Sequence, residues 1–255
     1  MVATIKEIYR HSENTAEVVI ADEAIARSAR AGHFVMIRFS EDQPRIPFSI
    51  VDASPGEGTF TIIIHKGARL THLINSLHPG RELPNLLGPL GQAFEVADYG
   101  TVLCIGDGEG FVPVLPVMHA LKDAGCRVLT ILSEFSEQNT CLVPNARRWS
   151  DELFHSANKE RAAALITEIA AREKVDLIVM TGPSDLLRLL TETARSIGIP
   201  ARCMLNKIML DGVGICGICR VMVGGERKLT CIDGPTFDAY EVDFTQLLNR
   251  QRNYV

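Results

Sequence analysis

The sequence lacks an excess of positive charge, a leader segment and any apolar run long enough to cross a bilayer. Its formal net charge is −5 over 255 residues, and no basic patch stands out. This charge balance argues against a nucleic-acid partner. The beginning of the chain has no charged stretch followed by an apolar one, so we expect a cytoplasmic protein without a membrane span.

The cysteines are not evenly spread along the chain. Of the seven cysteines, three lie between positions 216 and 231. The other four are scattered singly among apolar residues, and we expect them to be core thiols: Cys104, Cys126, Cys141 and Cys203.

The three clustered cysteines have a spacing typical of a metal centre. Cys216 and Cys219 form a Cys-x-x-Cys elbow, and Cys231 follows after a short loop that can bring its thiol back to the other two. Plant-type [2Fe–2S] sites begin with Cys-x4-Cys-x2-Cys, and here the residue five positions before Cys216 is Asp211. The spacing therefore predicts a cluster held by Asp211, Cys216, Cys219 and Cys231.

Simpler interpretations of the same residues remain open. A disulfide between Cys216 and Cys219 is disfavoured in a reducing cytosol. Zinc accepts both sulfur and oxygen ligands, and three buried cysteines could also bind no metal. Asp211 precedes a glycine, and an Asp-Gly pair most often only caps a turn. The glycines of the loop favour the iron–sulfur cluster, since their N–H groups can approach sulfur.

Residues 1–97 contain short segments that are β-branched or alternating, separated by Gly, Pro, Asp and Ser. Such a pattern predicts a small antiparallel β-barrel. The segments span residues 2–5, 16–20, 34–39, 48–51 and 59–64.

Residues 98–205 alternate between strand and helix patterns. Strands are expected at 101–105, 127–132, 175–180 and 200–205, and helices after Gly110, over 159–174 and from Ser184. The alternation predicts an α/β domain whose parallel sheet has helices on both faces. Its ligands should lie at the carboxyl ends of the strands, where 106–110 and 181–183 fall. We expect the remaining residues, 206–255, to form a small appendage that binds the [2Fe–2S] cluster.

Together, these three parts resemble the ferredoxin–NADP reductase superfamily. The resemblance rests on Arg45-Ile-Pro-Phe-Ser49, on the glycine-rich loop before Pro113, and on the cysteine motif. More narrowly, residues 211–220 and 231–235 with the tail 242–244 resemble two kinds of electron-transfer subunit. One kind belongs to dihydroorotate dehydrogenase B and has a fourth cysteine in place of Asp211. The more similar kind is the alpha subunit of NADH-dependent reduced ferredoxin:NADP oxidoreductase, also called sulfide dehydrogenase beta subunit.

The resemblance implies FAD in a barrel site and NAD(P)H at the glycine loop. Taken alone, each barrel residue would more often be an ordinary packing residue. The implied FAD residues are Arg45, Pro47, Phe48, Ser49, Ile63, Ile64, His65 and Thr71, although the family places its arginine one residue later than Arg45. The implied NAD(P) residues are Gly106, Gly108, Gly110 and Pro113.

The glycine loop departs from the family pattern Gly-Gly-Gly-x-Gly-x-Ala-Pro through two carboxylates, Asp107 and Glu109. Each exposed charge would oppose a pyrophosphate by about 1 kcal/mol. Residues 133–136 also lack the basic residue that the family tends to carry for the adenosine half. We therefore expect NAD(P)H binding to be weak or lost.

Three classes of function follow. The first is an oxidoreductase subunit in which FAD exchanges a hydride with NAD(P)H and passes electrons to the [2Fe–2S] cluster. The second is an electron relay or scaffold whose NAD(P) site has been lost. The third is a regulatory subunit with a structural metal, which would be colourless. By resemblance, the partner in a hetero-oligomer would be a larger flavin and iron–sulfur subunit, related to the small subunit of glutamate synthase. We expect this chain to dock on that partner through the face around Cys216, Cys219 and Ile215.

Overall fold

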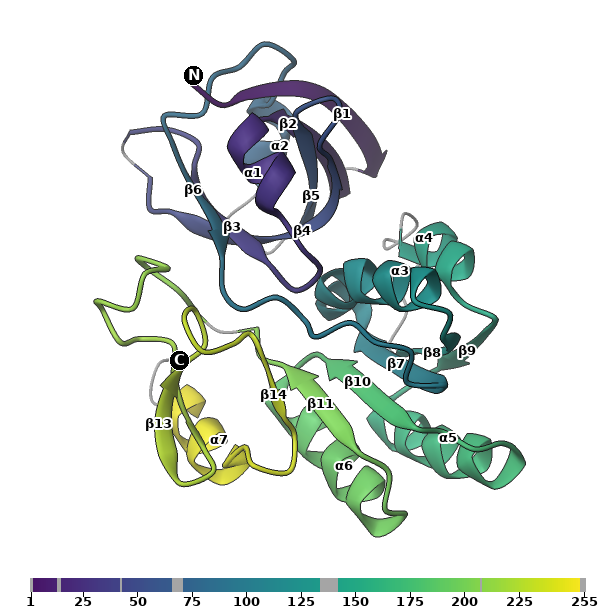
Figure 1. Ribbon diagram of the computed structural model, residues 1–255. Coiled ribbons are helices and arrows are strands. Elements are labelled where there is room, and N and C mark those ends of the chain that lie inside the picture. Colours follow the sequence, from purple (N-terminus) through teal and green to yellow (C-terminus); the bar gives the residue numbers. More distant parts are fainter. Residues whose placement is uncertain are drawn as a thin grey trace.

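The computed structural model describes residues 2–12, 15–41, 43–65, 71–133, 142–206 and 208–252, without the side chains of Thr71, His72, Glu109 and Arg252. A β-barrel lies against one end of an α/β sheet, and the C-terminal segment lies beside both (Figure 1). The cavity and the cysteine loop described below lie where these three parts meet.

The barrel is antiparallel, as predicted. Its strand order is β1-β2-β5-β4-β3-β6, and two short helices accompany it, α1 (Glu23–Ser28) and α2 (Thr71–Ser76). Helix α1 begins where the Asp22 carboxylate accepts a hydrogen bond from the Ile25 N–H at 3.0 Å, an N-cap. The strands are β1 (Thr4–Ser12), β2 (Thr15–Ala21), β3 (Phe34–Arg38), β4 (Ile46–Ser54), β5 (Thr59–His65) and β6 (Asn85–Leu90).

The second sheet has the order β14-β11-β10-β7-β8-β9, and all its pairs are parallel except β11 with β14. Its parallel strands are β7 (Thr101–Asp107), β8 (Arg127–Ser133), β9 (Glu152–Ser156), β10 (Leu177–Thr181) and β11 (Ala201–Met204). The helices are η1 (Gly108–Val114, a 3-10 helix), α3 (Leu115–Asp123), α4 (Leu142–Trp149), α5 (Lys159–Arg172) and α6 (Ser184–Ser196).

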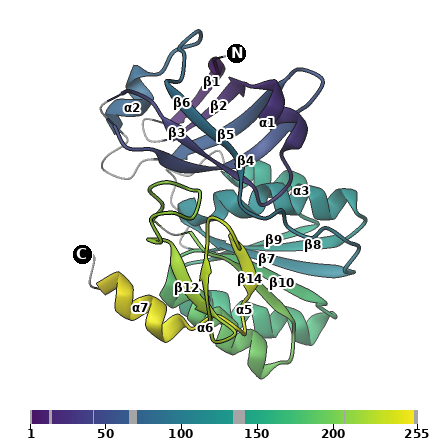
Figure 2. The same ribbon diagram turned by 60° about the vertical axis from the view of Figure 1, so that its left-hand side comes forward.

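Alternation along the strands explains why helices cover both faces of this sheet (Figure 2). In β7, Val102 and Cys104 pack in the same core as α3 and α4. Leu103 and Ile105 point to the opposite face, where they pack with α5 and α6. Successive residues of a strand face opposite sides, so one apolar run supplies both cores. The predicted two-faced parallel sheet is confirmed.

The C-terminal segment is built into the second sheet. It comprises the hairpin β12 (Arg220–Val223) and β13 (Glu226–Leu229), the strand β14 (Thr236–Asp238) and the helix α7 (Phe244–Arg252). Strand β14 pairs antiparallel with β11, with Phe237 opposite Cys203. Phe237, Phe244 and Leu247 lie in the same core as α5 and α6. The appendage therefore shares a core with the α/β domain.

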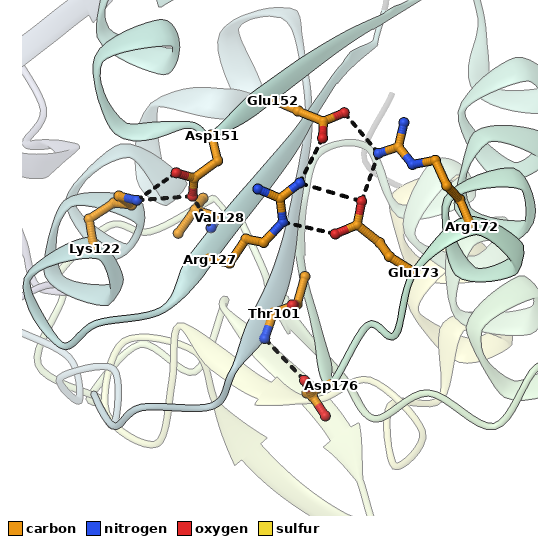
Figure 3. Close-up of polar contacts among 9 residues, drawn as sticks. All are labelled: Thr101, Lys122, Arg127, Val128, Asp151, Glu152, Arg172, Glu173 and Asp176. Atoms are coloured by element: carbon orange, nitrogen blue, oxygen red, sulfur yellow. Dashed lines mark hydrogen bonds and ion pairs between the residues drawn. The ribbon is translucent and has the colours of Figure 1, made fainter.

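A ring of charged side chains ties the amino ends of β8 and β9 to the end of α5 (Figure 3). Arg127 donates hydrogen bonds to Glu173 at 2.8 Å and to Glu152 at 2.6 Å. Arg172 donates to the same two carboxylates, at 2.8 Å in each case. Each glutamate thus accepts from two guanidinium groups, an arrangement that holds three elements together far from the cavity.

This ring predicts acid-sensitive stability. Hydrogen bonds from Arg127 and Arg172 lower the pKa of Glu173 below its ordinary value of 4.5. A carboxyl whose pKa is lower in the folded state stabilises the fold fully above its unfolded pKa, and this contribution is lost as the pH falls through the folded pKa. We expect Glu173→Gln to reduce the loss of unfolding free energy between about pH 6 and pH 3. Urea unfolding across that range measures it. Glu57→Gln at an exposed barrel turn is the control, and an unchanged pH dependence in Glu173→Gln would contradict the expectation.

Candidate functional site between barrel, sheet and cysteine loop

A cavity of about 660 Å³ opens between the barrel and the carboxyl ends of the parallel strands. Five of the residues predicted for FAD line it: Pro47, Phe48, Ser49, Ile63 and His65. The sheet contributes Gly108, Gly110 and Pro113 on one side, and Gly182 with Pro183 on the other. The structure therefore brings residues predicted for FAD and residues predicted for NAD(P)H to one cavity.

The barrel wall of the cavity follows from strand alternation. Ile63 and His65 of β5 face the cavity, whereas Ile64 is fully buried in the barrel core and does not line the cavity. The reason is that neighbouring residues of a strand point to opposite faces. The side chain of Thr71, the first residue of α2, lies outside the described side chains.

His65 is held in place by the neighbouring strand. Its Nδ1 lies 2.6 Å from Oγ1 of Thr15 on β2. Thr15 is buried, so this contact anchors the imidazole ring at the cavity wall to a fixed position on β2. Nothing in the sequence pattern indicated Thr15.

Arg45 lies just before β4, beside the main cavity. Its Nε donates a hydrogen bond to Oδ1 of Asn85 on β6 at 2.5 Å. The residue lines a second pocket of about 370 Å³ together with Ile208, and the other residues of this pocket also line the main cavity: Ile46, Pro47, Asn206 and Met209. Arg45 is therefore positioned next to the predicted flavin residues rather than among them.

The glycine loop reaches the cavity through Gly108, Gly110 and Pro113, but Gly106 does not line it. A Cβ on Gly106 would lie 2.9 Å from Cα of Phe111, so this glycine allows Phe111 to pack against β7. Asp107, the last residue of β7, does line the cavity. The side chain of Glu109 lies outside the described side chains.

The two predicted strand-end loops touch each other. A Cβ on Gly110 would lie 3.1 Å from Cα of Gly182, so the backbones of the loops after β7 and β10 are in close approach. The parallel register pairs Gly106 with Thr181, which places both loops at the same edge of the sheet. This is the edge where ligands of open α/β sheets bind.

The cysteine loop lies against the barrel strand β3. Cys219 and Cys231 are buried with their sulfur atoms 3.3 Å apart, and they pack with Phe34, Met36 and Met209. Burial and the hydrogen bond with Cys219 raise the pKa of Cys231 to about 12. Because thiolates are the metal-binding form, metal binding at this site would release protons.

Asp211 and Cys216 lie on the outer side of the loop. Cys216 is exposed, and its N–H donates to the Asp211 carboxylate at 2.5 Å, as does the N–H of Val213 at 3.0 Å. Partial burial raises the pKa of Asp211, but these hydrogen bonds outweigh it and leave the pKa below its ordinary value. Asp211 therefore caps the loop. In the described ranges, no three His, Cys, Asp or Glu side chains are gathered as a formed metal site.

Two glycines fit the loop closely to its surroundings. Gly212 has φ +74°, and a Cβ there would lie 2.5 Å from Cγ of Met36. The N–H of Gly214 donates a hydrogen bond to the sulfur of Cys231. The predicted approach of glycine N–H groups to sulfur is thus present at one of the three cysteines.

The cavity and the thiols share a wall. Phe34 and Met209 both line the cavity and pack in the cluster that contains Cys219 and Cys231. One layer of side chains therefore separates the two predicted cofactor sites. Met209 belongs to no sequence motif and lies in the apolar stretch 208–210 directly before the loop.

Comparisons with known proteins agree with this arrangement. Residues 206–243 match the family described as the iron–sulfur cluster binding domain of dihydroorotate dehydrogenase B. A solved structure of NADH-dependent reduced ferredoxin-NADP oxidoreductase, from a study of flavin-based electron bifurcation, is 31% identical with a TM-score of 0.88 and covers 98% of this chain and 92% of its own. A ferredoxin NADP+ reductase from Neisseria gonorrhoeae, 15% identical over 78% of this chain and 91% of its own, has a TM-score of 0.60 and shows the fold alone.

The fold is therefore that of the ferredoxin reductases, as predicted. Among the curated proteins, the dihydroorotate dehydrogenase B (NAD(+)) electron transfer subunit homolog of Thermotoga maritima is 33% identical, over 95% of this chain and 88% of its own length. The dihydroorotate dehydrogenase B (NAD(+)) electron transfer subunit of Clostridium perfringens is 26% identical, over 94% of this chain and 96% of its own length. The chain belongs to the family of dihydroorotate dehydrogenase B electron transfer subunits, and its predicted function as an electron-transfer subunit of an oxidoreductase is confirmed.

Of the helices described, none is long and apolar enough to span a membrane.

Proposed function

We propose that the chain binds FAD in the cavity and a [2Fe–2S] cluster at the cysteine loop, and passes electrons between them and a larger catalytic partner. The observation that carries this proposal is the shared wall of Phe34 and Met209. Two redox groups on either side of one side-chain layer are close enough for electrons to pass.

We also propose that the chain has three domains, residues 1–97, 98–205 and 206–255. We further propose that the protein is cytoplasmic, a location in which free thiols stay reduced.

The residues of the cavity fit a flavin. Phe48, Ile63 and Pro47 offer apolar surface to a flat ring, and Ser49 and His65 are the polar groups that can orient it. FAD, when bound, supplies the exchange between two-electron and one-electron transfer. The chain's own part is to exclude water from the ring and to hold His65 still through Thr15.

The donor set of the loop fits an iron–sulfur cluster. Cys216, Cys219 and Cys231 would supply three soft sulfur ligands, and Asp211 would supply one harder oxygen. A cluster, when bound, supplies a one-electron carrier. The hydrogen bond from Gly214 to the Cys231 sulfur is of the kind that orients ligands and tunes a centre.

The surface around the loop fits a docking partner. Five of the eight large apolar side chains found exposed lie on or beside the cysteine loop: Ile208, Leu210, Val213, Ile215 and Ile232. Ile215 is 85% exposed. A gathering of this kind marks a protein interface. We propose that it receives a larger flavin and iron–sulfur subunit similar to the small subunit of glutamate synthase.

A second candidate is a relay subunit that has lost its NAD(P)H site. The observation that favours it is the Asp107 carboxylate, which lines the cavity beside Gly108 and Gly110. A pyrophosphate binds at such a loop through backbone N–H groups and positive potential, and a carboxylate there reduces that potential.

An absorbance spectrum of the anaerobically purified chain tests the proposed function. We expect flavin bands and about two irons per chain, bleached by dithionite. Bleaching by NADH or NADPH would identify a subunit that oxidises NAD(P)H, and bands unchanged by either nucleotide would identify the relay. A colourless chain without iron would contradict the proposed function.

Removing the carboxylate at the loop should strengthen nucleotide binding. For Asp107→Asn we expect a several-fold lower Kd for NADH, because about 1 kcal/mol of repulsion is removed. Isothermal titration calorimetry measures it, with Asp123→Asn on α3 as a control of equal charge. A wild-type Kd in the micromolar range, or no change in Asp107→Asn, would show that the acidic loop does not weaken binding.

A further inference from the structure

The C-terminal helix α7 reaches back to the Cys-x-x-Cys elbow through Arg250. Its Nη1 donates a hydrogen bond to the carbonyl oxygen of Arg220 at 2.5 Å, and its Nη2 donates to that of Ile218 at 3.3 Å. The guanidinium of Arg220 in turn donates to the carbonyl oxygen of Gly217 at 3.1 Å. Two guanidinium groups therefore hold three carbonyl groups in and directly after the elbow.

The direction of these carbonyl groups fixes the direction of the neighbouring N–H groups. A trans peptide is planar, so the N–H that follows a carbonyl points the opposite way. Holding the carbonyls of Gly217 and Ile218 turns the N–H groups of Ile218 and Cys219 away from the guanidinium groups. The Cys219 carbonyl is held separately, by the Thr230 hydroxyl at 2.9 Å and its N–H at 3.2 Å. The backbone on both sides of Cys219 is thus fixed.

Arg250 also brings charge to this position. The residue is half-buried, and its Nε is buried without a hydrogen-bond partner. Among the ion pairs found between described residues, none includes Arg250, and its hydrogen bonds go to backbone carbonyls. A half-buried charge without a carboxylate costs stability, and its hydrogen bonds to the carbonyls of Ile218 and Arg220 hold this charge beside the elbow.

We propose that Arg250, assisted by Arg220, is a positioning residue that raises the reduction potential of the centre bound at Cys216 and Cys219. The proposal rests on the [2Fe–2S] cluster of the proposed function. Reduction adds one electron, drawn from the reduced flavin, and makes the cluster one charge more negative. A fixed positive charge stabilises that form over the oxidised one, and the guanidinium also polarises the peptides whose N–H groups face away from it.

The test is the midpoint potential of the cluster in the full chain, measured by a redox titration followed by electron paramagnetic resonance. Arg250→Gln removes the charge and keeps an amide donor. We expect the equilibrium constant for cluster reduction to fall about tenfold, which is about 59 mV for one electron. Arg250→Lys keeps the charge and should stay near the wild-type potential. Arg227→Gln removes the same charge from exposed β13 and should leave the potential unchanged.

Each outcome decides the proposal. A wild-type potential in Arg250→Gln, or an equal fall in Arg250→Lys and Arg250→Gln, would overturn it. If Arg250→Gln loses its iron, the same titration on Arg220→Gln decides: a smaller fall in potential supports the proposal, and no fall overturns it. A wild-type chain that holds no iron would overturn the proposed function as well, which separates the two failures.

Discussion

Replacing Cys231 with serine is expected to reduce the iron content from about two atoms per chain to nearly none, while the flavin content stays unchanged. Cys231 is 1% exposed, and its sulfur lies 3.3 Å from that of Cys219. A serine hydroxyl is a poor ligand where soft thiolates select an iron–sulfur centre. The residues proposed for FAD lie across the wall of Phe34 and Met209 and do not depend on this ligand. Iron and flavin assays of the anaerobically purified chain measure both quantities.

Cys126→Ser is the matched control for this experiment. Its thiol is also buried, and it accepts a hydrogen bond from the Tyr99 N–H at 3.4 Å and donates one to the Ala97 carbonyl at 3.3 Å. A hydroxyl can make both bonds, so iron and flavin should stay at wild-type values. Iron retained in Cys231→Ser would show that this cysteine is not a ligand.

A methyl group added at Gly212 should destabilise the protein more than the same group added at Gly217. Both glycines have positive φ, +74° and +63°, where an L-residue costs roughly 1–2 kcal/mol. At Gly212 the Cβ would also lie 2.5 Å from Cγ of Met36 and 3.0 Å from Cδ1 of Leu90. Forcing a methyl into a packed site costs about 1–3 kcal/mol more. At Gly217 nothing lies within 4 Å of the added Cβ.

Urea unfolding of Gly212→Ala and Gly217→Ala measures the difference between the two sites. We expect the unfolding free energy to fall by about 2–5 kcal/mol in the first variant and by about 1–2 kcal/mol in the second. Equal losses would mean that the loop does not fit β3 as closely as Met36 and Gly212 indicate.

The fold was largely predictable because its strands and helices follow regular apolar patterns. Five of the six barrel strands and the parallel sheet are of this kind. Strand β6 was not predicted because Gly88 and Pro89 are residue types typical of turns, which indicated the end of the barrel there. Helix α4 and strand β9 lie in a partly polar stretch that indicated no regular element. Strand β14 is only three residues long, and its place beside β11 depends on how the chain folds around the cysteine loop.

The candidate site was predictable where residues cluster in a motif. The motifs around Pro47, Gly108 and Cys219 all reach the region where the barrel, the sheet and the C-terminal segment meet. Ile64 and Gly106 fell outside the cavity because strand alternation and packing decide which side chain faces it. Thr15 and Arg250 lie far along the sequence from these motifs, and Met209 precedes the cysteine motif without being part of it. Only the tertiary structure shows that all three lie at the site. The ligand and cofactor roles of the motif residues stay predictions.

The position of β14 also sets an order for biosynthesis. A ribosome releases Cys216, Cys219 and Cys231 before Thr236–Asp238, the strand that closes the sheet beside β11. All three thiols are thus present while the edge of β11 is still unpaired. During synthesis, all three cysteines of the loop are therefore available before β14 pairs with β11. A chain that ended before Thr236 would leave the edge of β11 unpaired, and an unpaired strand edge promotes aggregation.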